Sequence, residues 1–401
     1  MSWEKTTIGK HCEITSSKRI FFSDYTDHGI PFFRSKEIIE MVQHKDISES
    51  LFISQEKYDE IACKFGVPSA GDLLLTSVGT IGIPYIIKES DHFYFKDGNL
   101  TWFRNFDTGL LSAFLYYWFL SDEGIGVLNN STIGSSQKAL TISNIKKIQI
   151  PLFPLNIQSK IVSILSAYDS LIENNQKQIK LLEEAAQRLY KEWFVDLRFP
   201  GWENTKIVDG VPEGWTCTKL GKILKTFSGS TPSRQNNEYY QDGSIPWLKT
   251  KELNDHFILS TEEKITETAL KSTSVHIIEK ESVIMAMYGA TIGKLGISTS
   301  ALTCNQACCV FDLTVSPLTN EFLFSWLYHK KPYLISLGKG AAQPNLSQEF
   351  IQSIDIILPP SIFIEEYTRL THPFFQSIKN NQEKIEHLSI LRNQLLKNLL
   401  H

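Results

Sequence analysis

The chain has 401 residues, of which 42% are hydrophobic and 21% charged, with a formal net charge of −4. This length suits two or three domains with buried cores, and the composition is that of an ordinary globular protein. No apolar run approaches the roughly 20 residues of a membrane-spanning helix. The slight acidity excludes a strong global attraction to nucleic acid.

The N-terminal and cysteine patterns predict a reducing cytoplasm as the location. Residues 1–11 lack the charged and then apolar regions of a secretory signal. The six cysteines form no Cys-x-x-Cys pair. Cys304, Cys308 and Cys309 cluster in an apolar, strand-like run, which favours buried thiols over a metal site.

Four segments follow one another along the chain. We expect an irregular, aromatic-rich domain over residues 1–155 and a continuous helical pattern over 156–200. An irregular, strand-rich domain over 201–360 and a second helical pattern over 361–401 follow. The predicted fold class is therefore α+β, with two pseudo-repeated α/β domains joined by two long helices.

The two irregular segments are copies of each other. Their matching blocks occur in the same order, which predicts one frame used twice. The blocks are SWEKTTIGK from Ser2 and GWTCTKLGK from Gly214, IPFFRSKEI from Ile30 and IPWLKTKEL from Ile245, SVGTIG from Ser77 and MYGATIG from Met287, and GSSQKALTISNIKKIQIPLFP from Gly134 and GAAQPNLSQEFIQSIDIILPP from Gly340.

The two helical segments also match, without a gap. LIENNQKQIKLLEEAAQRLYKEWF from Leu171 aligns with SIKNNQEKIEHLSILRNQLLKNLL from Ser377. In both, seam residues recur in steps of four and three, the heptad pattern of a coiled coil. We expect the two helices to pair as an antiparallel coiled coil, rather than each packing only on its own domain. The predicted pairing residues are Ile172, Asn175, Ile179, Leu182, Ile378, Asn381, Ile385 and Leu388.

Asn175 and Asn381 occupy equivalent seam positions near the middle of each helix. A seam asparagine costs stability but fixes the register, because its amide requires a polar partner. In an antiparallel pair the midpoints coincide, so we expect these two side chains to meet. A helix of about 37 residues would be about 55 Å long, a length that suits a spacer.

The sequence carries no recognisable catalytic motif. It has no Gly-x-Gly-x-x-Gly after a strand, no His-x-His or His-Glu-x-x-His spacing and no Asn-Pro-Pro-Phe-like tetrad. GATIGKL from Gly289 resembles a phosphate-binding loop, but Leu295 stands where Ser or Thr would hold magnesium. Its counterpart in the first half lacks the lysine, so a repeated structural turn is favoured. We predict a chain that is not an enzyme and binds no metal.

Polar and cationic residues at the repeated turns are candidates for DNA contacts. Phosphates are contacted by Lys, Arg, Ser, Thr and backbone N–H groups, and bases by Arg, Lys, Asn and Gln. Such turns are otherwise solvated loops, but the two copies carry different side chains, as readers of two different sequences would. The candidates are Arg34, Ser35, Lys36, Ser77, Gly79, Thr80, Ser135, Ser136, Gln137, Lys138, Lys249, Thr250, Lys251, Tyr288, Gly289, Thr291, Lys294 and Gln343.

The region between the two irregular segments resembles a known family. RLYKEWFVDLRFPG from Arg188 and DGVPEGW from Asp209 are similar to the central conserved region of type I restriction–modification specificity subunits. The IPLFP and ILPP endings, each followed by a helix, resemble that family's domain-to-helix junctions. Neither half has the Pro-x-x-Glu-Gln form common at these junctions. The resemblance covers the whole chain.

The resemblance implies a non-catalytic subunit with two target recognition domains. Each domain would read one half of a bipartite, asymmetric site in double-stranded DNA. Methylation subunits, two per chain, would dock on the helices and bind S-adenosylmethionine. Restriction subunits would add cleavage driven by ATP with Mg, and this chain itself would hold no cofactor and contact no membrane. The alternative is a pseudo-symmetric coiled-coil scaffold that binds proteins rather than DNA.

Overall fold

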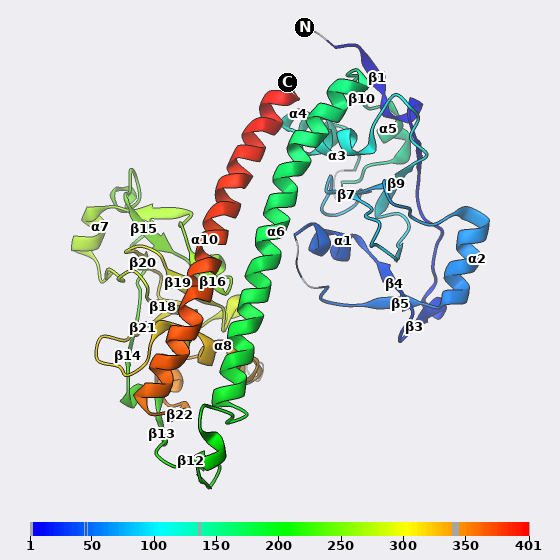
Figure 1. The fold of residues 1–401 in the computed structure, drawn as a ribbon. Helices are drawn as coiled ribbons and strands as arrows, with labels where there is room; N and C mark the ends of the chain where they lie inside the picture. The colour runs from blue at the N-terminus through cyan, green and yellow to red at the C-terminus, as the bar shows by residue number, and fades with distance from the viewer. Residues whose placement is uncertain (1–2, 44, 46, 135–137, 339–344, 401) are drawn as a thin grey trace. The chain divides into compact units, whose positions relative to one another are not determined.

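The structure is a computed structural model that describes residues 3–43, 45, 47–134, 138–338 and 345–400. Its contacts divide the chain into two units. Unit 1 comprises Met1–Leu171 and Leu388–His401, and unit 2 comprises Ile172–His387. Figure 1 labels many of the elements of both units.

Unit 1 is built on two four-stranded sheets and one short strand pair. The first sheet has the order β2-β9-β6-β7 and is antiparallel throughout, and the second has the order β3-β5-β4-β8, with β4 and β8 parallel. Strand β1 pairs with β10. The bounds are β1 Lys5–Thr7, β2 Glu13–Thr15, β3 Tyr25–Thr26, β4 Ile30–Phe33, β5 Leu51–Ile53, β6 Leu73–Thr76, β7 Pro84–Ile86, β8 Tyr94–Phe95, β9 Leu100–Arg104 and β10 Gln149–Pro151.

The β2-β9-β6-β7 sheet of unit 1 is buried on both faces. Leu73 and Leu75 of β6 lie in one hydrophobic core with helices α3 to α5, whereas Leu74 lies in a second core with α1 and β8. Successive strand residues point to opposite faces, so one apolar run supplies both cores. The helical elements are η1 Ile8–Lys10, η2 Phe22–Asp24, α1 Ser35–Val42, α2 Gln55–Phe65, α3 Ser112–Leu120, α4 Asp122–Asn130 and α5 Ile142–Lys147.

Unit 2 repeats this plan with one more strand in its main sheet. The order β14-β21-β18-β19 matches β2-β9-β6-β7, and β16 is added in parallel beside β19. A three-stranded sheet has the order β17-β15-β20, and β13 pairs with β22. The bounds are β11 Ile207–Val208, β12 Val211–Pro212, β13 Thr216–Lys219, β14 Lys225–Ser228, β15 Ile245–Leu248, β16 His256–Ile258, β17 Glu263–Ile265, β18 Val283–Ala286, β19 Leu295–Ser298, β20 Thr303–Cys304, β21 Cys308–Asp312 and β22 Asp355–Leu358.

The helices of unit 2 follow the same order, with one local difference. Where unit 1 forms α1 after β4, unit 2 forms a short turn, η6, and then β16. Asp255, between them, has a φ of 71°, a left-handed conformation that ends the turn. The elements are η3 Trp202–Asn204, η4 Leu220–Lys222, η5 Asn237–Tyr239, η6 Thr250–Glu252, α7 Glu267–Ser272, η7 Gly289–Thr291, α8 Asn320–Gly338 and α9 Gln348–Gln352.

The two long helices are α6, Leu155–Phe194, and α10, Ser361–Leu399, and each has a part in both units. Helix α10 continues through Pro373. In unit 2, Gln178 of α6 contacts Asn381 of α10, while Ala186 contacts Tyr367, so the two helices run antiparallel.

The predicted fold class is confirmed by these two α/β repeats and by the two long helices that pack together. Of the predicted pairing residues, Ile172, Asn175, Ile179, Ile378 and Asn381 are buried, whereas Leu182, Ile385 and Leu388 are half-buried. Their role in helix pairing stays a prediction. In the described part of the chain, no helix is both long and apolar enough to cross a bilayer. The proposed boundaries at 155, 200 and 360 stay predictions, because the two units are defined by contacts and not by the repeat.

Candidate nucleic-acid interface

In unit 1 the first candidate turn joins β4 to α1. The Arg34 backbone N–H donates to Glu37 Oε2 at 2.7 Å, which caps α1, and Arg34 Nη2 lies 2.6 Å from Glu37 Oε1. Arg34 Nη2 also lies 2.7 Å from Glu49 Oε2. Hydrogen bonds to Glu37 and Glu49 raise the pKa of Arg34. The guanidinium is therefore charged, and two carboxylates neutralise it locally.

The equivalent turn of unit 2 joins β15 to η6 and repeats this arrangement with a lysine. The Lys249 backbone N–H donates to Glu252 Oε1 at 3.0 Å. Lys249 Nζ lies 2.5 Å from Glu263 Oε1 and 3.3 Å from Glu262 Oε2. The hydrogen bond to Glu263 raises the pKa of Lys249. The two units thus share a capped turn and differ in the cation that it carries.

The next two residues of each turn point to different environments. Ser35 Oγ donates to the Asn99 carbonyl at 3.2 Å, whereas Lys36 is exposed. In unit 2, Thr250 is half-buried, and the exposed Lys251 forms an ion pair with Glu262. Lys36 and Lys251 are thus the more accessible cations of the two turns.

The second candidate turn of unit 1 follows β6. Ser77 is 1% exposed, and its hydroxyl donates to the Leu75 carbonyl and lies 2.6 Å from Thr101 Oγ1. Gly79 and Gly82 have φ angles of 79° and 86°, which favour glycine. Gly79 and Thr80 are exposed. The accessible part of this turn is therefore Gly79–Thr80, with Ser77 bonded beneath it.

The corresponding turn of unit 2 follows β18. Tyr288 is 39% exposed, Gly289 is exposed and Thr291 is half-buried. Lys294, at the end of this turn, places Nζ 2.8 Å from Asp255 Oδ2. Lys331 of α8 approaches the same Oδ2 at 2.6 Å. The turn that lacks a cation in unit 1 thus carries an ion-paired lysine in unit 2.

The third candidate block lies largely outside the described residues. Ser135, Ser136, Gln137 and Gln343 all fall there. Lys138 is described and exposed. The DNA contacts expected of this block stay predictions.

The sequence reasoning did not single out Arg234, in the loop between β14 and η5. Its guanidinium carbon lies 4.3 Å from the ring centroid of Tyr240 and 5.1 Å from that of Trp247. Arg234 Nη1 lies 2.7 Å from Glu263 Oε2, so one carboxylate contacts both Arg234 and Lys249. The sequence feature that could have identified Arg234 is the scarcity of arginine in this region, since it is the single arginine between Arg198 and Arg369.

The helical pair carries its two asparagines buried at the seam. Asn175 is 8% and Asn381 is 5% exposed. Asn381 Nδ2 donates to Gln178 Oε1 at 3.1 Å, one turn from Asn175 on the opposite helix. Asn381 therefore has an interhelical polar partner, and the expected contact between the two asparagines stays a prediction.

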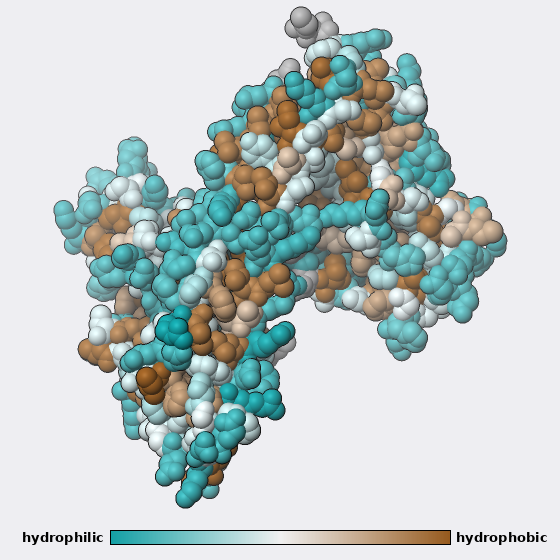
Figure 2. All heavy atoms as spheres, viewed as in Figure 1, coloured by the Kyte–Doolittle hydropathy of each residue, from teal (hydrophilic) through white to brown (hydrophobic). Residues whose placement is uncertain are grey.

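An open groove runs between α6 and α10 beside this hydrogen bond. Its volume is about 510 Å³. Leu181, on its wall, is 64% exposed although it is a large apolar residue. On the face shown in Figure 2, hydrophilic residues cover much of the middle of the helical pair. The groove is lined by Gln178, Leu181, Leu182, Ser377, Asn380, Asn381 and Lys384.

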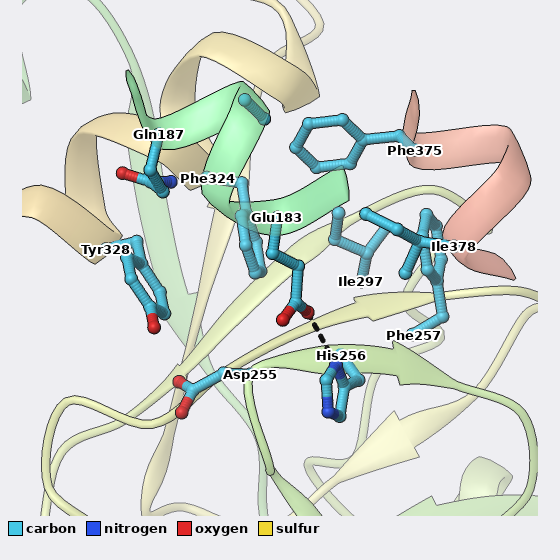
Figure 3. A pocket seen from close by; sticks show the side chains of 11 residues that line it. Glu183, Gln187, Asp255, His256, Phe257, Ile297, Phe324, Tyr328, Phe375 and Ile378 are labelled. Atoms are coloured by element: carbon cyan, nitrogen blue, oxygen red, sulfur yellow. Dashed lines mark ion pairs between the residues drawn. The ribbon is translucent and has the colours of Figure 1, made fainter. Parts of the chain in front are cut away.

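A smaller cavity, of about 30 Å³, lies where β16 meets the helices of unit 2 (Figure 3). Such a volume holds about one water molecule. His256 Nδ1 lies 2.9 Å from Glu183 Oε1 of α6, without an aligned hydrogen bond. Phe324 of α8 and Phe375 of α10 meet edge to face on its wall, with centroids 5.7 Å apart. This cavity is a junction between sheet and helices.

Comparisons with known proteins agree on one family. A family model described as the type I restriction modification DNA specificity domain matches residues 1–184 and 212–389. The MjaIX specificity subunit of Methanocaldococcus jannaschii is 30% identical over 346 residues, 84% of this chain and 78% of that protein. The HindI specificity subunit of Haemophilus influenzae is 23% identical over 360 residues, 73% of this chain and 77% of that protein.

A solved structure has the same fold. The S subunit of a type I restriction–modification system from M. genitalium superposes with a TM-score of 0.64. The match covers 100% of this chain and 96% of that chain, at 16% sequence identity. The frame of two α/β repeats and two long helices is therefore shared where most of the sequence has changed.

Proposed function

The chain belongs to the type I restriction–modification specificity subunits, and we propose that each of its two α/β units reads one half of a bipartite DNA site. Subunits of this family provide sequence specificity, and the catalytic activities lie in other subunits. The half-sites would differ in sequence, which makes the whole site asymmetric.

One observation carries this proposal: the same capped turn occurs twice with different side chains. Arg34 and Lys249 each follow the equivalent strand, and a glutamate three residues later accepts each backbone N–H. A shared frame holds both turns alike, while the cation that each turn carries differs, and arginine and lysine are not interchangeable in binding. Two units that recognise different DNA sequences would use such a common frame with different side chains.

The local ion pairs agree with the net charge of −4 of the chain. The cations at the turns are paired with carboxylates, so little free positive charge attracts DNA in general. Binding would then depend on base contacts and on phosphate contacts from partner subunits. This arrangement favours specific over non-specific binding.

We infer that the paired helices are the docking surface for the methylation subunits, two per chain. The groove beside Asn381 presents the exposed Leu181 next to amide groups and the ammonium of Lys384, a mixture suited to a protein partner. The methylation subunits would bind S-adenosylmethionine, and restriction subunits would use ATP with Mg. This chain would hold neither.

The test is to co-express the chain with the methylation subunits of its system and to map methylated adenines by long-read sequencing. We expect a bipartite motif with one methylated adenine in each half. Replacing residues 214–360 by the matching segment of another specificity subunit should change one half only. An intact, active complex that methylates without sequence preference would contradict the proposal, as would a replacement that changes both halves.

A further inference from the structure

We propose that Arg234 is the residue through which unit 2 recognises a guanine in its half-site. The inference rests on the proposed function, since it assumes that unit 2 reads DNA. Guanine presents two acceptors, O6 and N7, in the major groove, and the arginine fork is the commonest partner for that pair. Unit 2 has one arginine between Arg198 and Arg369 with which to make this contact.

The guanidinium of Arg234 is held in place by two aromatic rings. Its carbon lies 4.3 Å from the Tyr240 centroid and 5.1 Å from the Trp247 centroid. Both rings are fixed by the loop that carries Arg234: Trp247 Nε1 donates to the Ser230 carbonyl at 3.1 Å, and Tyr240 donates to the Pro232 carbonyl at 2.6 Å. A side chain ordered in advance loses less entropy when it binds.

One edge of this guanidinium is engaged and the other is free. Nη1 lies 2.7 Å from Glu263 Oε2. In the described part of the chain, neither Nε nor Nη2 has a hydrogen-bond or ion-pair partner, and the side chain is 53% exposed. The Nε–Nη2 edge presents two parallel N–H groups, the geometry that O6 and N7 of guanine accept.

The surroundings of Arg234 suit a DNA surface. Glu263 also contacts Lys249, and the neighbouring Glu262 contacts Lys251, so three cations lie close together. Such lysines can hold the phosphates on either side of a recognised base. Glu263 would orient Arg234 without touching the DNA, which makes it a positioning residue.

Unit 1 does not repeat this arrangement. Arg19 precedes Ile30 by as many residues as Arg234 precedes Ile245. Its Nε is bonded to Asp97 Oδ2 at 2.9 Å, and its side chain is 69% exposed. Among the described residues, no aromatic ring lies under the Arg19 guanidinium. The proposed contact therefore belongs to one half-site.

The test uses Arg234→Ala and Arg234→Lys variants of the full chain, co-expressed with its methylation subunits. Adenine methylation is mapped genome-wide, and binding is measured on duplexes with each base substituted in turn. We expect Arg234→Ala to relax one guanine position in one half-site, by roughly 5- to 150-fold in relative affinity. Arg234→Lys should keep the fold and the charge but lose most of this preference, since an ammonium cannot bond both acceptors.

Two further variants separate the roles of the neighbours. Glu263→Gln should weaken the guanine preference while binding to unrelated duplexes rises, because a negative charge beside the DNA is removed. Lys219→Ala is the matched control, since Lys219 pairs with Asp355 on the β13–β22 strands. Its motif should equal that of the wild type.

Three results would overturn the assignment. The first is an unchanged motif in both folded Arg234 variants, and the second is an equal loss of affinity at every position, as a phosphate contact would give. The third is a wild-type motif in which the half-site read by unit 2 contains only A·T pairs. Sequence-independent methylation by the wild-type complex would instead refute the proposed function. Thermal unfolding of each variant identifies any that fail to fold, and Arg234→Lys then decides alone.

Discussion

The carboxylate of Asp255 in unit 2 accepts hydrogen bonds from several donors. Its Oδ2 accepts from Lys294 and Lys331, and its Oδ1 accepts from the Leu295 backbone N–H at 3.0 Å. Burial by itself would raise the pKa of Asp255, but the hydrogen bonds from the two lysines hold it below its ordinary value of 3.8. The side chain is 13% exposed, so solvent screens these bonds only weakly.

We predict that Asp255→Asn lowers the free energy of unfolding by about 2 kcal/mol at pH 7. The reason is that Lys294 and Lys331 lose the carboxylate charge that both of them contact. A pKa that is lower in the folded state contributes stability above pH 3.8 and loses it as pH falls through the folded pKa. The difference between variant and wild type should therefore shrink below pH 4. Urea unfolding at pH 7 and pH 3 measures this difference in the free energy of unfolding. The control is Asp355→Asn, which removes one partner of an exposed ion pair. A difference that stays constant with pH would contradict this account.

Single-residue patterns predicted which turns carry cations but not what those cations contact. Glu37 lies three residues after Arg34, the spacing of a helix-capping pair, so this contact can be predicted from local sequence. Lys294 bonds to Asp255, 39 residues away, and Glu263 joins Arg234 to Lys249 across two loops. Such partners meet only after the strands pair, so their ion pairs are not visible in local sequence.

At the scale of elements, the two units attach their helices to the long pair by different chemistry. In unit 1, Tyr117 of α3 donates to Asp169 of α6 at 2.7 Å, and Arg392 of α10 approaches the same carboxylate at 2.9 Å. In unit 2, the Tyr367 hydroxyl of α10 donates to the Ala186 carbonyl of α6 at 3.2 Å and lies 2.8 Å from the Ser325 hydroxyl of α8. One junction is charged and partly exposed, and the other is neutral and buried.

We predict that salt distinguishes the two junctions. Arg392→Leu should destabilise unit 1 by about 1 kcal/mol at low salt and by less at 1 M salt, since screening weakens a partly exposed ion pair. Tyr367→Phe should cost unit 2 about 1–3 kcal/mol at either salt concentration, because it removes buried hydrogen bonds. Hydrogen exchange of the α6 amides on each side of residue 172 reports the two effects separately. Equal salt dependence at both junctions would contradict the assignment.

The helices were the most predictable elements, and the segment after each capped turn was the least. Heptad spacing pointed to Ile172, Ile179 and Ile378, which are buried, because periodicity directly reports a buried face. The repeat of IPFFRSKEI as IPWLKTKEL suggested equal structures beyond it. Unit 1 instead continues into α1, whereas unit 2 turns at Asp255 into β16. The pair Asn254–Asp255 is the local sequence feature that indicates this turn, since both residue types tolerate the left-handed conformation.

At the scale of the whole molecule, the repeat separates what is constant from what varies. A four-strand order in the main sheet and the capped turn recur in both units, whereas the cations and aromatic residues at the turns differ. If the helices act as a spacer, their length should set the distance between the two half-sites without changing either sequence. Both long helices contribute to both units, so a matched change in the two can be made without altering any strand.

We predict that inserting one heptad after Gln176 and one after Gln382 lengthens the gap between half-sites by up to about three base pairs. Seven residues add about 10.5 Å of helix, against 3.4 Å for each base pair, and a heptad preserves the seam. The methylated motif of the co-expressed complex measures the gap. Seven residues inserted at the exposed Asp209–Gly210 turn of the β11–β12 hairpin are the control and should leave it unchanged. An unchanged gap in the helix variant, or an altered half-site, would show that the helices do not act as the spacer.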